Sequence, residues 1–169
     1  MERPLTPQEI RILDICRDIE LASEQLYHYF SQIYCADDHI AVIWQKTAQE
    51  ERNHANQFSL ATKLKFGMID RINLDFANAE GMLTYARSVL DAARNKPPLL
   101  GDALRSAIEL EEKLEGFHMD CLATFTEESY QQMFKAMMDA DSGHIKTLRL
   151  AYSKLVMASS PSSSDFAAV

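Results

Sequence analysis

Four acidic residues and two histidines recur at spacings that could place them around one metal centre. Glu51 and His54 form an E-x-x-H motif, and Asp141 and His144 form a D-x-x-H motif. Residues three apart lie on one face of a helix, so each pair could bind one metal ion together. A lone motif of this kind often arises by chance as a solvated pair, and it needs support from the rest of the chain.

That support comes from a repeat of the whole pattern. The first Glu lies 31 residues before the E-x-x-H motif, and its counterpart lies 30 residues before the D-x-x-H motif. Each of these two Glu residues is followed, seven residues later, by Tyr or His. The matching sets are Glu20, Tyr27 and Glu51-x-x-His54, then Glu111, His118 and Asp141-x-x-His144. The two sets therefore look like halves of one pseudo-two-fold site.

The acids of this pattern fall on stripes of apolar residues that a helix would bury. Glu20 lies four residues after Cys16, and Glu111 lies three residues after Ile108. Buried carboxylates repel one another strongly unless cations neutralise them or they take up protons. Two ions that share bridging carboxylates would remove this cost. The predicted metal ligands are Glu20, Glu51, His54, Glu111, Asp141 and His144, a set without thiolate that favours iron or manganese over structural zinc.

Long helices are needed to bring these residues together, and the composition favours them. The chain has 169 residues, 47% of them apolar, with only five Gly and five Pro. Helix breakers are scarce and helix formers are common, which predicts an all-α protein. We expect one domain over residues 1–157 and a disordered Ser-rich tail over residues 158–169.

The expected helices follow from caps and apolar periodicity. Thr6 and Glu9 form a capping box that opens the first helix. Gly67 is the expected end of the second helix, and two prolines close the segment that follows it. The helices are expected over residues 6–34, from the turn at 36–38 to 67, over 79–94, over 100–125 and over 127–157.

Four of these helices are long, and the fifth is short and lies in the connection over residues 68–98. Two antiparallel hairpins joined by one long crossover are typical of a ferritin-like four-helix bundle. The simplest alternative at this point is a helical bundle that binds no metal.

The chain resembles the rubrerythrin branch of the ferritin-like superfamily over residues 6–155. There the first and third helices carry a Glu followed by an aromatic residue, and the second and fourth carry E-x-x-H. The resemblance implies two iron ions, with manganese or mixed occupancy as variants, that react with hydrogen peroxide or dioxygen. It also implies that Tyr27 hydrogen-bonds to a ligand carboxylate.

The chain departs from the family in three places. His118 stands where the family usually has a second Tyr, and Asp141 stands where it has Glu. Leu114 stands where rubrerythrins have an additional Glu that belongs to their peroxidase chemistry. The chain also has no rubredoxin domain, so turnover would need an external electron donor.

Several alternatives remain open from the residues alone. The protein could store or oxidise iron, as a ferroxidase does, or it could be a metal-binding bundle without catalysis. The side chains of Glu24 and Glu115 could point toward the site and act as extra or substitute ligands. Solvated positions or helix ion pairs are the preferred interpretation of these two residues. His118 could be a seventh ligand or a proton carrier, and an imidazole behind the ligands is the preferred interpretation.

The net charge and the cysteine content limit which partners and which cell compartment we expect for the protein. The net charge of −8 argues against nucleic acid or an anionic membrane as the main partner. Three scattered cysteines, Cys16, Cys35 and Cys121, suit a reducing compartment. With no signal segment and no long apolar run, we expect a cytoplasmic protein. The resemblance and the apolar residues Tyr34 and Tyr85 on outer faces lead us to expect a homodimer.

Overall fold

The computed structural model describes residues 4–63, 69–72, 74–120, 123–125 and 128–159. These residues form helices and one pair of very short strands, so the expected all-α class is confirmed. In chain order the elements are α1 (Pro7–Ile33), α2 (Asp38–Ala61), β1 (Ile69–Ile72), α3 (Phe76–Asn95), α4 (Leu100–Asp120), β2 (Ala123–Phe125) and α5 (Glu128–Ser159).

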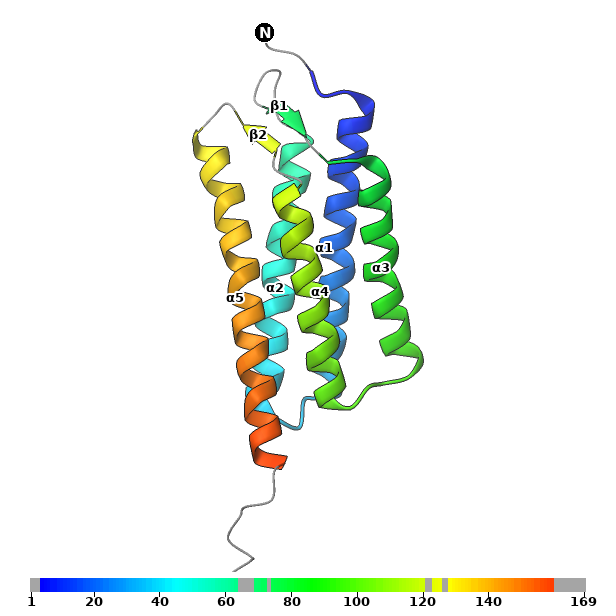
Figure 1. The fold of residues 1–169 in the computed structure, drawn as a ribbon, viewed down its shortest axis with the longest axis vertical. Coiled ribbons are helices and arrows are strands. Elements are labelled where there is room, and N and C mark those ends of the chain that lie inside the picture. The colour runs from blue at the N-terminus through cyan, green and yellow to red at the C-terminus, as the bar shows by residue number, and fades with distance from the viewer. Residues whose placement is uncertain (1–3, 64–68, 73, 121–122, 126–127, 160–169) are drawn as a thin grey trace, which may run out of the picture.

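The four long helices that carry the predicted ligands lie side by side along the length of the molecule (Figure 1). Helix α1 runs opposite to α2, and α4 runs opposite to α5, so each pair forms an antiparallel hairpin. Helices α2 and α4 run in the same direction, and α3 lies between them in the chain. Helix α3 packs on the outer side of α1 through Ala86 and Leu90, leaving the bundle interior to the other four helices.

Side-chain caps start three of the helices where the sequence places good capping residues. Thr6 accepts a hydrogen bond from the Glu9 N–H at 3.2 Å, and the Thr6 N–H donates to the Glu9 carboxylate at 2.8 Å. This is the expected capping box, which satisfies two amide groups at the start of α1. Asp37 and Asp75 cap α2 and α3 more simply, each accepting one hydrogen bond, from the Ile40 N–H and the Asn78 N–H. Because Asp75 is the cap, α3 begins at Phe76, three residues before the expected start.

Two expected helix ends are wrong. Helix α2 ends at Ala61 and not at Gly67, because its last turn tightens and the Lys63 N–H donates to the Leu60 carbonyl. Gly67 itself lies outside the described residues. Helix α4 ends at Asp120 and not at residue 125, because Ala123–Phe125 forms strand β2, which pairs antiparallel with β1. Neither strand was expected from the sequence.

The core fills the space between the four long helices with large apolar side chains. Trp44, Tyr27, Phe30 and Phe58 are fully buried, together with leucines and isoleucines of the expected stripes. Helix α5 continues to Ser159, two residues into the expected tail, and the rest of that tail lies outside the described residues. The stripes that fill the core also carry the acids of the predicted site.

Tyr34 and Tyr85, which motivated the expectation of a homodimer, both contact their own chain. The Tyr34 hydroxyl donates to the Pro98 carbonyl at 2.6 Å, and the Lys113 ammonium lies 5.1 Å from the centre of the Tyr85 ring. The homodimer stays a prediction. None of the described helices is long and apolar enough to cross a lipid bilayer.

Candidate metal centre

All six predicted ligands converge in the middle of the bundle. They come from α1, α2, α4 and α5, and each is at most 4% exposed. Tyr27 and His118, the two residues expected beside the ligands, are buried with them. Periodicity explains the convergence, because each acid occupies the same face of its helix as the surrounding core residues.

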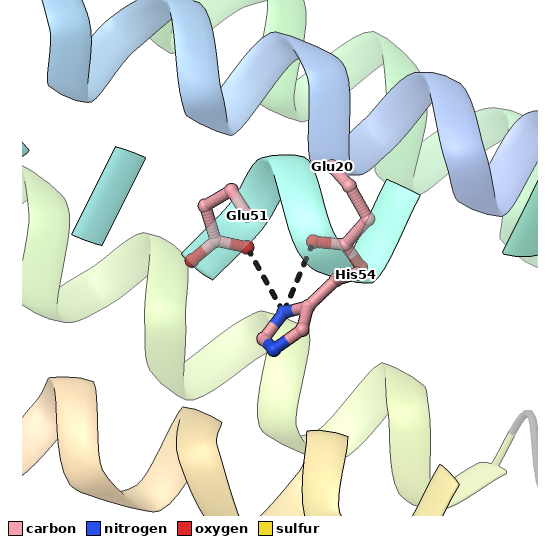
Figure 2. Close-up of side chains that lie close together, drawn as sticks. All are labelled: Glu20, Glu51 and His54. Carbon is pink, nitrogen blue, oxygen red and sulfur yellow. Dashed lines mark ion pairs between the residues drawn. The ribbon is translucent and has the colours of Figure 1, made fainter. Parts of the chain in front are cut away.

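One group of ligand atoms surrounds His54. Its Nδ1 atom lies 3.3 Å from Oε2 of Glu51 and 3.9 Å from Oε2 of Glu20. Figure 2 shows both carboxylates pointing at this nitrogen, Glu20 from α1 and Glu51 from the same helix as His54. Asp141 approaches from α5 and places Oδ1 at 3.7 Å from the same nitrogen. The His54 imidazole therefore faces three carboxylates from three helices.

A second group surrounds His144. Its Nδ1 atom lies 3.1 Å from Oε1 of Glu51 and 3.4 Å from Oε2 of Glu111. Glu51 thus turns one oxygen toward each histidine, and the rings of His54 and His144 lie 6.0 Å apart. The two groups are neighbouring positions that share one carboxylate.

The spacing within each group suits a metal ion. Ligand atoms that each bind one ion at about 2.1 Å lie about 3.0 to 3.4 Å from one another, in octahedral or tetrahedral arrangement. The ligand atoms of Glu20, Glu51 and His54 lie within 4.8 Å of one another, and so do those of Glu51, Glu111 and His144. Asp141 belongs to neither of these tight groups, although it faces His54. These buried groups could hold metal ions.

Two further side chains hold the carboxylates from behind. The Tyr27 hydroxyl of α1 donates to Oε1 of Glu111 on α4. The second contact joins the same two helices with their roles exchanged, because Nε2 of His118 on α4 lies 2.7 Å from Oε1 of Glu20 on α1. The other ring nitrogen of His118 lies 2.6 Å from Oδ2 of Asp141. Each held carboxylate keeps its second oxygen free to face a histidine of the metal groups.

Aromatic residues enclose these holding residues. Trp44 stacks on Tyr27 with ring centres 5.7 Å apart, and Phe58 and Phe117 lie 6.0 and 5.7 Å from the His118 ring. Bulky apolar neighbours fix the ring positions and keep water away, which strengthens electrostatic interactions inside the site.

Burial and mutual repulsion govern the protonation of the carboxylates. Burial raises the pKa of Glu20 from 4.5 to about 8, although the His118 imidazole acts in the opposite direction. Burial and the charge of Glu51 raise the pKa of Glu111 to about 7. Burial alone would also raise the pKa of Glu51, but hydrogen bonds with His144 and His54 outweigh it and hold this pKa below its usual range. Without a cation, Glu20 and Glu111 are therefore not both fully ionised near neutral pH.

Contacts with the carboxylates raise the pKa values of the histidines. Burial opposes the charged form of His144, but hydrogen bonds with Glu111 and Glu51 raise its pKa from 6.5 to about 12. The charges of Glu20 and Asp141 likewise raise the pKa of His118 well above its usual value despite burial. Protons on these rings supply the positive charge that the carboxylates require in the absence of metal.

Several buried polar atoms at the centre have no hydrogen-bond partner of good geometry. They include Oε2 of Glu20 and Nδ1 of His54. The close contacts of Oε1 of Glu20 with Nε2 of His118, and of Oε1 of Glu51 with Nδ1 of His144, also lack the angles of a hydrogen bond. Buried polar atoms are almost always hydrogen-bonded, and a cluster of exceptions calls for an explanation such as an ion. The donor set of carboxylate oxygens and imidazole nitrogens is of the kind that binds divalent metal ions, and these groups could hold them.

Glu50 is a site residue that the sequence analysis missed. Its Oε2 atom lies 2.7 Å from Nε2 of His144, the ring nitrogen that points away from the centre. Its side chain is 33% exposed, and the Lys46 ammonium lies 3.9 Å from its other oxygen. A carboxylate in this position fixes the ring of a metal-binding histidine and raises the basicity of its inner nitrogen. The only signal for it in the sequence is its place beside Glu51.

The two additional acids considered as ligands point elsewhere. Glu24 forms an ion pair with Arg52 at 2.7 Å, and Glu115 accepts a hydrogen bond from Ser142. Leu114, which stands where rubrerythrins have the additional Glu, is buried in the core. The contacts of Glu24 and Glu115 both join neighbouring helices, α1 to α2 for Glu24 and α4 to α5 for Glu115.

Comparison with protein-family models, with curated proteins and with solved structures finds no match to this chain. The account of its function therefore rests on the residues and geometry of the centre.

Proposed function

We propose that the centre binds two divalent metal ions, iron in the first place, and that the protein reduces peroxide or dioxygen with electrons from an external donor. The observation that carries this proposal is the position of Glu51 between two histidines of different hairpins. One oxygen faces His54 and the other faces His144, so Glu51 is the carboxylate that both positions would share. When bound, two iron ions would supply the two electrons for reducing the oxidant.

The chain's own residues would contribute binding, orientation and shelter. Glu20, Glu51 and Glu111 offer carboxylate oxygens at the two groups, and Asp141 faces His54. Tyr27 and His118 orient these carboxylates through the contacts described above. Phe58 and Phe117 beside His118 exclude water and would limit the escape of reactive oxygen species.

The chain offers a carrier for the protons that the reaction would need. Glu50 is part-exposed and contacts the outer nitrogen of His144, so it links the buried ring to solvent. A proton on Nε2 of His144 can therefore exchange through Glu50 while Nδ1 remains directed at the centre.

The test is a reaction of the ferrous protein with oxidant. The full chain is loaded without oxygen with two equivalents of ferrous iron, mixed with hydrogen peroxide or dioxygen, and followed by near-ultraviolet absorbance. A rapid change that is absent in the Glu51→Ala/His144→Ala variant supports the proposal. A wild-type protein that holds two ferrous ions and shows no absorbance change would refute the redox activity and leave a non-catalytic metal-binding bundle.

The same experiment separates an enzyme from an iron-storage protein. An enzyme keeps its two ions after each turnover, so excess ferrous iron stays in solution. A ferroxidase that feeds a store oxidises many equivalents of iron and releases them, which iron analysis after gel filtration would detect.

A further inference from the structure

The two histidines of the centre face unequal sets of carboxylates. Three carboxylate oxygens lie within 4 Å of Nδ1 of His54, at 3.3, 3.7 and 3.9 Å, and they belong to Glu51, Asp141 and Glu20. Two carboxylates, Glu51 and Glu111, lie within 4 Å of Nδ1 of His144, at 3.1 and 3.4 Å. A cation at the His54 position would therefore meet one more carboxylate than a cation at the His144 position.

The holding residues add to this imbalance. His118 contacts one oxygen of Glu20 and one of Asp141, and the second oxygen of each is the atom that faces His54. Tyr27 holds one carboxylate, Glu111, whose second oxygen faces His144. Two carboxylates are thus fixed in advance at the His54 position and one at the His144 position. Ligands that are already oriented lose less conformational freedom when they bind an ion.

The short side chain of Asp141 completes the asymmetry. Glu51 reaches both histidines, but its pseudo-symmetric counterpart Asp141 faces His54 with one oxygen and His118 with the other. The Asp141 side chain is one methylene shorter than that of Glu. Its second oxygen, which would have to extend to His144, already contacts His118. Among the described residues, Glu51 alone faces both histidines.

We infer that the two metal positions are unequal: the position at His54 binds the first ion tightly, and the position at His144, which faces one carboxylate fewer, binds the second ion more weakly. This inference rests on the proposed two-metal function and adds an order of binding. It also assigns His118 as the positioning residue of the tight position and Tyr27 as that of the weak position.

Stepwise binding to the wild-type protein does not by itself test the inference. Two divalent ions a few ångströms apart repel each other, so even a symmetric centre would bind the second ion more weakly than the first. Single variants that each remove one position avoid this problem, because each then binds one ion only. His54→Ala and His144→Ala form a matched pair, since the two histidines occupy equivalent places in the two halves.

The experiment is a calorimetric titration of each full-length variant with Mn²⁺, after circular dichroism has verified its helix content. The expected result is one site in each variant, with His54→Ala binding about 10 to 100 times more weakly than His144→Ala. Equal affinities, or tighter binding by His54→Ala, would overturn the inference. A wild-type protein that binds no Mn²⁺, Co²⁺ or Fe²⁺ would instead refute the proposed function.

A crossed pair of variants tests the assignment of the positioning residues. In the His144→Ala background, His118→Phe should weaken Co²⁺ binding about 10 to 100-fold and change the visible spectrum of bound Co²⁺, while Tyr27→Phe should change neither. In the His54→Ala background the two effects should exchange. The same effect of both substitutions in both backgrounds would show that they act through general packing and would overturn the assignment. If His118→Phe does not fold, His118→Gln, which keeps an N–H donor, replaces it in both backgrounds.

Discussion

The two halves of the centre share one plan but differ in how tightly they hold their acids. In the half built around His54, a buried imidazole contacts two carboxylates at once. In the half built around His144, a tyrosine hydroxyl donates a hydrogen bond to one carboxylate, and the histidine itself contacts the part-exposed Glu50. The difference indicates that a repeated motif can bring equivalent residues together while the residues that contact them from behind differ between the halves.

Glu51 is the residue on which both halves depend, and its loss should have the largest effect. We expect Glu51→Ala to lose both ions, because one oxygen of Glu51 faces each histidine. Glu20→Ala and Glu111→Ala should each impair one position by about 100-fold or less and retain the other. Metal content after dialysis against a fixed free Mn²⁺ concentration measures this. Retention of two ions by Glu51→Ala would show that the halves do not share a ligand.

The holding residues should also differ in their effect on the stability of the metal-free protein. His118→Phe leaves the buried Glu20 and Asp141 without their partner, and breaking a buried ion pair from one side costs about 3–5 kcal/mol. Tyr27→Phe removes one hydrogen bond to Glu111, a loss of about 1–3 kcal/mol. Urea unfolding at pH 7 measures both values. A larger loss for Tyr27→Phe would reverse the comparison between the halves.

The pH dependence of stability should distinguish the two halves as well. A carboxyl group with a raised pKa in the folded protein binds a proton there that the unfolded chain releases, so its contribution to stability is lost as pH rises through the folded pKa. For Glu111 that pKa is about 7, and for Glu20 it is about 8. The raised pKa of His144 acts in the same direction above 6.5. We therefore expect the free energy of unfolding of the metal-free protein to fall from pH 6.5 to 8.

Gln variants resolve this dependence by residue. Glu111→Gln should flatten the stability curve below about pH 7, and Glu20→Gln should flatten it up to about pH 8. Metal affinity should change in the opposite sense and rise with pH, because ions displace protons from carboxylates and imidazoles. Urea titrations at half-unit pH intervals check the stability curves, and Mn²⁺ calorimetry at the same pH values checks the affinity. A stability that rises from pH 6.5 to 8 would contradict the first statement, and an affinity that falls would contradict the second.

The smallest expected effect is that of Glu50, which touches the centre only through His144. Glu50→Gln should weaken metal binding at the His144 position about tenfold and leave the His54 position unchanged. Glu24→Gln is the matched control, because Glu24 is also a part-buried acid of the bundle but pairs with Arg52. Mn²⁺ calorimetry measures both variants, and an equal effect of the two would remove Glu50 from the site.

Much of the fold could be predicted from local signals. The capping box at Thr6 and the cap at Asp37 depend on neighbouring residues, so the sequence alone locates these two helix starts. The cap at Asp75 is just as local, but it was not recognised, and α3 begins three residues before the expected start. The pairing of β1 with β2 could not be predicted in this way. It joins Ile69 to Phe125 across more than 50 residues, and both strands are too short for an alternating pattern to stand out.

The site shows the same division between local and distant signals. Glu20 and Glu111 can be recognised because charged residues on an apolar stripe violate the pattern around them. Glu50 follows no such pattern, because it lies one residue off the buried face and meets His144 only through the packing of α2 against α5. The double contact of His118 likewise depends on how α4 lies against α1 and α5, which spacing along one helix does not specify.

The central claim, that the bundle core binds two metal ions, is tested most directly by metal analysis. The protein is purified without chelators, loaded anaerobically with ferrous iron or Mn²⁺, desalted and analysed by inductively coupled plasma mass spectrometry beside the Glu51→Ala/His144→Ala variant. The account predicts about two ions per wild-type chain and none in the variant. A wild-type chain that retains no metal, or a variant that retains as much as the wild type, would contradict it.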